Sequence, residues 1–253
     1  MIKFFRKIRQ RLLSENKFSK YLIYAIGEIL LVVIGILIAL QINNWNENQK
    51  TKKLEIEFLE NLQIDLEIDI SDFNRRIKDS EYIVKNNYQF IHETYKTQEN
   101  FKDFKTLVGM LWWNSEYFAA QNSTYNELSN SGQLNIISNK DLKKSILSHY
   151  LFHETASNHI AEFNDFSIVQ LSKIIPFVIK SKMNEHIFDE PHMYKETYWE
   201  FINDPSSQKF ILLESTAAVY ANKHKLFKNY FEELLKETQL LVDQIDEELK
   251  SKK

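Results

Sequence analysis

Two histidines one helical turn apart come closest in this sequence to a known chemical motif. In His149-x-x-x-His153, followed by Glu154, a helix would place both imidazoles on one face, where they could bind a zinc ion. The zinc-protease form of this motif requires Glu directly after the first histidine, but Tyr150 stands there. Because no third ligand lies in register, we expect solvated or core histidines, with no metal and no cofactor.

Aromatic residues gather in a second stretch of the sequence. Those that could line a ligand pocket between helices are Trp112, Trp113, Tyr117 and Phe118. Aromatic residues of this kind more often pack one helix against another, so both interpretations stay open.

Three acidic residues, Asp65, Glu67 and Asp69, alternate with apolar ones. Side chains two residues apart on a helix do not face each other, so we expect these carboxylates to lie on a solvated face without converging. The sequence has no glycine-rich phosphate loop, no nucleophile elbow and no Ser-His-Asp order. It also lacks cysteine, which excludes disulfides and cysteine nucleophiles. We therefore expect no catalytic residues and a protein that is not an enzyme.

Composition indicates a helical protein. The chain has 253 residues, of which only four are glycine and three are proline, so the residues that favour turns are scarce. The formal net charge of -3 is too small to suggest a nucleic-acid partner.

An apolar segment near the N-terminus has the length of a transmembrane helix. Between Leu22 and Ile42 it has 21 residues, 14 of them Leu, Ile or Val. As a helix it would rise about 31 Å, close to the hydrocarbon thickness of a bilayer. These residues favour insertion by roughly 4 to 8 kcal/mol, which outweighs the roughly 2.5 to 3.5 kcal/mol that Glu28 would cost at the helix centre. A buried core helix or a cleaved signal peptide fits less well, so we predict one transmembrane helix over residues 21–43.

The flanking charges predict the orientation of this helix. Seven cationic residues precede the apolar segment and three follow it closely, and cationic residues favour the cytoplasmic side of a membrane. We predict a basic cytoplasmic segment over residues 1–20 and an extracytoplasmic domain over residues 46–253. Tyr21 and Trp45 would be interfacial anchors. The first twenty residues could also form an amphipathic helix that binds anionic lipid, or could only set the topology.

The residues of the predicted transmembrane helix that fall within about 60° of one face are Tyr24, Glu28, Gly35 and Ala39. Gly35-x-x-x-Ala39 is a pair of small residues of the type that lets two membrane helices approach closely. A carboxylate on the same face is tolerable against a partner's hydrogen-bond donor. Alternatively, Glu28 lies shallow enough to be hydrated from the cytoplasmic side. The first interpretation predicts that the helix associates with a second copy or with another membrane protein.

Beyond the membrane, apolar residues recur with helical spacing. From Leu59 to Tyr95 the mean step is 3.6, although LQIDLEIDI over residues 62–70 alternates as a strand would. Two seven-residue series, which start at Leu213 and at Ala217, predict a last helix that packs along its whole length.

Capping residues divide this region further. Ser131-Gly132 predicts a helix end, and Ser138-Asn139-Lys140-Asp141 predicts the start of a helix that Pro176 would bend or end. We predict a loop with short turns over 183–198 and a last helix capped by Asp204-Pro205. The predicted fold is all-α: a single N-terminal transmembrane helix followed by an elongated up-and-down bundle of about four main helices.

Two stretches of the sequence resemble a family of bacterial envelope proteins, the domain of unknown function 6090. They are MIKFFRKIRQRLLSENKFSKYLIYAIGEILLVVIGILIALQINNWNE at the start and STYNELSNSGQLNIISNKDLKKSIL in the middle. The first is the more specific, with Gly-Glu, an apolar run, Gly-Ile-x-Ile-Ala and Asn-x-Trp-Asn in that order. The resemblance implies a single-pass protein of the bacterial inner membrane with a helical periplasmic domain. It implies no activity, cofactor or catalytic residue.

These observations together predict a membrane-anchored envelope protein that acts as a non-enzymatic interaction or scaffold protein. The alternative is an extracytoplasmic small-molecule sensor. Because only about twenty residues would lie in the cytoplasm, such a sensor would have to signal through a partner protein.

Overall fold

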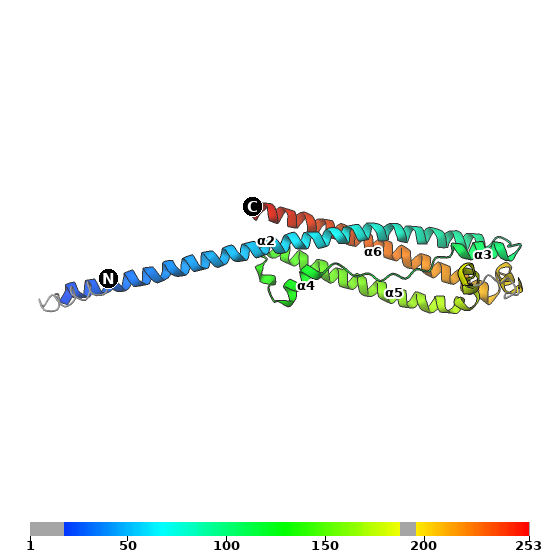
Figure 1. Ribbon diagram of the computed structural model, residues 1–253, viewed down its shortest axis with the longest axis horizontal. Helices are drawn as coiled ribbons and strands as arrows, with labels where there is room; N and C mark the ends of the chain where they lie inside the picture. The colour runs from blue at the N-terminus through cyan, green and yellow to red at the C-terminus, as the bar shows by residue number, and fades with distance from the viewer. Residues whose placement is uncertain (1–17, 188–195, 253) are drawn as a thin grey trace. The chain divides into compact units, whose positions relative to one another are not determined.

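The structure, a computed structural model, describes residues 18–187 and 196–252 (Figure 1). The chain divides into two compact units, Met1–Glu57 and Phe58–Lys253. The described residues form helices, turns and one extended segment, with no strand among them, so the predicted all-α class is confirmed. The basic segment predicted over residues 1–20 lies mostly outside the described residues.

Helix α2 (Phe18–Thr94) is the longest element and belongs to both units. The absence of glycine and proline between Gly35 and the end of the helix at Thr94 lets it run without a break. In the first unit, α2 contains one segment that is long and apolar enough to cross a membrane, and its large side chains are exposed. LQIDLEIDI lies within α2 and is therefore helix, despite its strand-like alternation.

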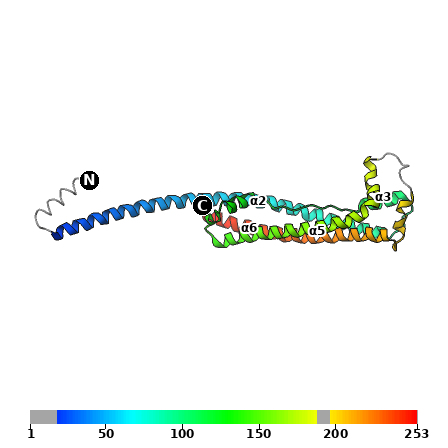
Figure 2. The same cartoon turned by 90° about the horizontal axis from the view of Figure 1, so that it is seen from below.

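The second unit contains three long helices: the later part of α2, α5 (Lys140–Ile187) and α6 (Gln208–Lys252). They lie side by side in both views (Figures 1 and 2). Helix α6 runs antiparallel to α2, because Gln63 bonds Asp246 at 2.9 Å and Glu81 pairs with Lys228 at 2.7 Å.

An extended segment, residues 111–122, occupies the fourth position of the bundle, and we call it the strap. It links two short helices, α3 (Phe101–Met110) and α4 (Ser123–Asn130), and follows the long helices in Figure 1. Two 3-10 helices, η1 (Leu134–Ile136) and η3 (Glu196–Asn203), complete the connections. The element order is up-and-down, with α2 and α5 running one way and the strap and α6 returning.

Two of the predicted helix boundaries are confirmed. Helix α4 ends at Asn130, and Gly132 adopts φ of 71°, the left-handed conformation that glycine tolerates. Helix α5 begins at Lys140, where Asn139 Oδ1 accepts hydrogen bonds from the backbone of Asp141 and Leu142 at 3.0 and 3.1 Å.

The last helix begins three residues later than Pro205 would place its start. Ser207 Oγ, and not Asp204, accepts the capping hydrogen bond, from Phe210 N at 3.2 Å. Asp204 Oδ1 instead accepts from Ser206 N at 3.0 Å and so closes the turn before the helix.

The connection predicted over 183–198 is also partly helical. Pro176 lies inside α5, which continues to Ile187, so positions 183–187 are helix where a loop was predicted. Positions 196–198 belong to η3, and 188–195 lie outside the described residues.

The seam of α6 is as predicted, because all ten residues of its two seven-residue series are buried. The seam of α2 differs from the prediction. One series of its buried and nearly buried positions follows strict alternating steps of three and four: Leu59, Leu62, Leu66, Asp69, Phe73, Arg76, Ser80, Ile83, Asn87, Phe90 and Thr94. Glu55, Phe58 and Asp65 are buried outside this series. The predicted apolar ladder drifts off this seam, and its members Tyr88 and Tyr95 are 49% and 60% exposed.

Candidate functional site

The strap has no strand partner, so side chains of the long helices complete its backbone hydrogen bonds. On α2, Asn87 bonds the strap at Trp112, and Asp69 Oδ1 accepts from Gln121 N at 3.0 Å. On α5, Ser157 Oγ donates to Phe118 O at 2.8 Å. The buried polar residues of the bundle therefore fix an extended segment among helices.

Lys223 of α6 is the most unusual of these residues. It is 3% exposed, and its Nζ lies 4.2 Å from the centre of the Tyr220 ring. The oxygens that accept from Nζ, at 2.9 to 3.2 Å, are Asn114 O, Ser115 Oγ, Asn164 Oδ1 and Ser167 Oγ. All four are neutral.

Burial away from any carboxylate partner lowers the pKa of Lys223 from 10.5 to about 7. His224 lies beside it, with Nε2 3.2 Å from Asn114 O. Because a carbonyl oxygen can only accept, that nitrogen carries the hydrogen. Burial also lowers the pKa of His224 to about 4.

Two of the three alternating acidic residues converge on the strap, which corrects the prediction of a solvated face. Glu67 is exposed as predicted, but Asp65 and Asp69 are only 9% and 2% exposed. Asp65 Oδ2 accepts from Ser123 Oγ and Thr124 N at 3.2 and 3.1 Å, so it caps α4 from another helix. They converge because the strap's end and the start of α4 pass over this face of α2.

Asp69 has one unsatisfied oxygen. Its Oδ2 is buried and makes no hydrogen bond to any residue in the described part of the chain. Burial, opposed by the hydrogen bond from Gln121, raises the pKa of Asp69 from 3.8 to about 6.

The histidine pair lies in the core of the bundle. His149 and His153 are 5% and 2% exposed, with ring centres 4.2 Å apart. None of their four nitrogens has a partner in the ranges that the structure describes. Burial lowers the pKa of His149 to about 4 and that of His153 to about 3, so both rings are neutral at physiological pH. Among residues 18–187 and 196–252, no three His, Asp or Glu side chains are placed to hold a metal ion.

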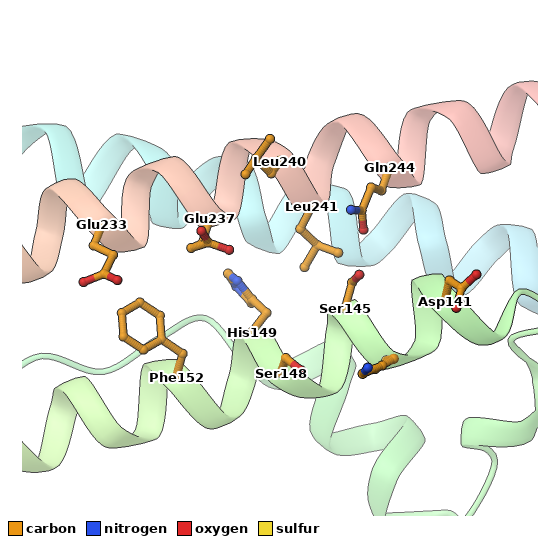
Figure 3. A pocket seen from close by; sticks show the side chains of 11 residues that line it. Asp141, Ser145, Ser148, His149, Phe152, Glu233, Glu237, Leu240, Leu241 and Gln244 are labelled. Atoms are coloured by element: carbon orange, nitrogen blue, oxygen red, sulfur yellow. The ribbon is translucent and has the colours of Figure 1, made fainter.

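His149 faces an open groove between α5 and α6. Figure 3 shows its ring extending from α5 toward α6, between Glu237 and Leu241. The groove has a volume of about 550 Å³, and Glu233 and Phe152 lie on either side of one end. We take this groove as the candidate ligand site.

The four aromatic residues proposed as a pocket are not gathered into one. Phe118 is buried against Phe73 and Phe231, whereas Trp113 packs on a separate core cluster around Phe104. The other two, Trp112 and Tyr117, are 38% and 58% exposed. An extended strap sends neighbouring side chains in different directions, which disperses this set.

The residues proposed for the membrane helix all belong to α2. Ala39 and Trp45 are exposed, Glu28 is half-buried, and a Cβ atom at Gly35 would meet nothing within 4 Å. For Tyr21 and Tyr24 the structure gives the helical backbone. The predicted association of this face remains a prediction.

Sequence reasoning missed the residues that hold the strap, Lys223 and Asn164 above all. One signal could have pointed to the members of this set on α2. Two strict seven-residue repeats in α2, one from Leu59 and one from Leu62, would have placed Ser80, Asn87 and Asp69 in the seam. Buried polar residues at such positions require hydrogen-bond partners, which here include the backbone of the strap.

Comparison with known proteins gives one match. Residues 28–173, more than half of the chain, match a family of unknown function, DUF6090. No curated protein and no solved structure matches the sequence significantly. The matched range includes the apolar segment from Glu28 onward, the strap, α4 and most of α5. The chain belongs to the DUF6090 family.

Proposed function

We propose that this chain is a single-pass, membrane-anchored interaction protein of the bacterial envelope. In this proposal α2 crosses the inner membrane over residues 21–43, with the basic N-terminal segment in the cytoplasm and residues 46–253 in the periplasm. The exposed apolar side chains of that segment and the excess of cationic residues before it support this topology.

An exposed apolar ridge on α5 is the main observation that supports a role in binding another protein. Phe163, Phe166 and Val169 are 40%, 54% and 56% exposed and follow each other in steps of three, so they are neighbours on the helix surface. Contiguous apolar side chains of this size mark protein contacts more often than free surface. Glu162 and Asp165 flank the ridge and are exposed, which favours a partner with cationic residues around an apolar helix face.

The polar interior supports a non-enzymatic role. Asn87, Asn164 and Lys223 could resemble catalytic residues by burial alone, yet each one bonds the backbone of the strap. Their hydrogen-bonding capacity is used to hold the fold.

The topology can be tested with a reporter enzyme fused after Lys253. We expect activity from alkaline phosphatase, which folds only outside the cytoplasm, and none from a cytoplasmic reporter. The opposite pattern would refute the proposed orientation.

The interaction surface can be tested by site-specific photo-cross-linking in living cells. We expect a photoreactive residue at Phe163, Phe166 or Val169 to capture the same protein each time. The same probe at Lys225, an exposed position on α6, is the control and should not capture that protein. Equal cross-linking from Lys225 and from the ridge would contradict the proposal.

A small-molecule sensor that signals through a partner is a second candidate function. The observation that favours it is the groove between α5 and α6, whose volume of about 550 Å³ falls in the range of ligand sites. A buried histidine without hydrogen-bond partners lines this groove.

A further inference from the structure

The groove between α5 and α6 carries carboxylates that have no partner. Glu233 and Glu237 line it from α6, and neither side chain forms an ion pair or hydrogen bond within the described part of the chain. Other acidic residues of the same helix are paired: Glu232 with Lys228 at 3.5 Å and Glu248 with Lys252 at 2.8 Å. Glu233 and Glu237 therefore keep their full charge available for a ligand at the groove.

The lining has a net negative charge. Asp141 adds a third carboxylate and Lys144 one cation. Asp141 also lies in the first turn of α5, where an acidic residue stabilises the helix, so Glu233 and Glu237 are the carboxylates left for a ligand.

His149 supplies a second, independent observation. Its side chain is only 5% exposed, yet the ring lines the groove. Both ring nitrogens lack a hydrogen-bond partner among the described residues. A buried polar group without a hydrogen bond is costly, so a bound group that bonds the ring would remove that cost. Since the ring is neutral, one nitrogen can accept a hydrogen bond from a cation without repelling it.

The groove also has apolar surface and length. Phe152 and Leu241 lie among its polar side chains (Figure 3). A second hollow of about 340 Å³ shares Ser145 and Gln244 with it and extends the groove toward Ser251. From Glu233 to Ser251 the helix rises about 27 Å. A ligand that matches has cationic groups separated by short apolar stretches.

We propose that this groove binds a linear aliphatic polyamine. Its ammonium groups pair with Glu233 and Glu237, one N–H donates to His149, and its methylene groups lie on Phe152 and Leu241. This inference takes its site from the second candidate function, but binding is measured without any signalling partner. If the groove does not bind a polyamine, the proposal that the apolar ridge on α5 contacts a partner protein still stands.

The test is calorimetric titration of the full-length protein in lipid nanodiscs with spermidine. Glu233→Gln and Glu237→Gln keep the side-chain shape and remove one charge each. We expect each substitution to weaken binding about tenfold, the contribution of one charge-assisted hydrogen bond. Asp243→Asn removes the same charge from an exposed position of α6 outside the groove, and we expect it to change affinity less than twofold, that is by under about 0.4 kcal/mol.

A second readout follows His149 directly, because spermidine should shift the ring nitrogen signals of His149 in NMR spectra and leave those of His159 unchanged. Absence of spermidine binding would overturn the proposal, as would an equal loss of affinity in Asp243→Asn. Zinc chloride is titrated in parallel. A shift of the His149 signals with zinc and none with spermidine would identify a metal site and refute the polyamine.

Discussion

Asn87 pairs with the backbone of Trp112 as a neighbouring strand would. Its Nδ2 donates to Trp112 O at 2.9 Å, and its Oδ1 accepts from Trp112 N at 3.2 Å. One amide side chain on a helix thus satisfies both backbone groups of an extended residue. This relationship explains how a segment without strand partners is stable inside a helical bundle.

Replacing Asn87 with leucine should destabilise the bundle by about 1 to 3 kcal/mol, because the N–H and C=O of Trp112 lose their partner. Urea unfolding of the full-length protein, followed by circular dichroism, measures the change. Asn86→Leu is the matched control, since Asn86 bonds the carbonyl of Tyr82 in its own helix and no strap residue that the structure describes. An equal loss in both variants would show that the Trp112 contact contributes nothing.

Asp69 should make stability fall as pH rises. Its folded pKa of about 6 lies above the unfolded value of 3.8, so the folded state holds the proton more tightly. Stability is therefore greatest below about pH 4 and declines through pH 6, by about 3 kcal/mol in total for this group. The asparagine variant keeps an acceptor for Gln121 N and removes the charge.

We accordingly expect Asp69→Asn to become more stable than the wild type as pH rises from 4 to 6.5, measured by urea unfolding at each pH. Glu67→Gln, on an exposed position of the same helix, should show no such trend. A difference between Asp69→Asn and the wild type that stays constant with pH would disprove the proposed titration.

The α2 seam shows which parts of the fold the sequence could predict. In α6 the seam positions are mostly apolar, so a seven-residue repeat was visible and every residue of it is buried. In α2 the seam includes the polar residues Asp69, Arg76, Ser80 and Asn87. They interrupt the apolar repeat by which a buried seam is recognised in a sequence. Apolar residues outside the seam, such as Ile64 and Ile68, are 56% and 48% exposed and produced the strand-like alternation.

The strap itself could not be predicted for a related reason. Its residues carry no glycine or proline, so nothing local forbids a helix there. Its extended conformation depends on side chains distant in sequence, such as Lys223, which lies 109 residues beyond Asn114. The groove at His149 was equally hidden, because the two helices that form it meet only in the folded bundle.

Lys223 should make stability rise with pH above neutrality. Its folded pKa of about 7 lies below the unfolded value of 10.5, so between these values the unfolded state binds more protons. Relative to Lys223→Met, the wild type should gain up to about 1.4 kcal/mol per pH unit between pH 7 and 10. The neutral amine still donates two hydrogens, so its bonds to the strap persist.

Urea unfolding at pH 7, 8 and 9 measures this gain. Lys225→Met is the control, since Lys225 is exposed two residues away on the same helix. If the difference between wild type and Lys223→Met is the same at pH 7 and 9, then the amine keeps its proton in the fold and the prediction is wrong.

The face of α2 that contains Glu28 and Gly35 should hold two copies of the chain together in a membrane. A Cβ atom at Gly35 would meet nothing within 4 Å apart from its own helix backbone, so we expect Gly35→Ile to act mainly on contacts made with another molecule. Close approach of two helices depends on small residues at this position, and a carboxylate on the same face is tolerable against a partner helix that supplies a donor.

Since the chain has no cysteine, Thr51→Cys provides a single labelling site for energy transfer between two labelled populations in lipid vesicles. Gly35→Ile and Glu28→Leu should each weaken association about fivefold to thirtyfold, which corresponds to about 1 to 2 kcal/mol. Gly27→Ile adds the same bulk about 90° from the centre of the face and should leave association unchanged. If Gly35→Ile and Glu28→Leu associate as well as the wild type, then this face holds no partner copy, and Glu28 only marks the depth of the helix in the membrane.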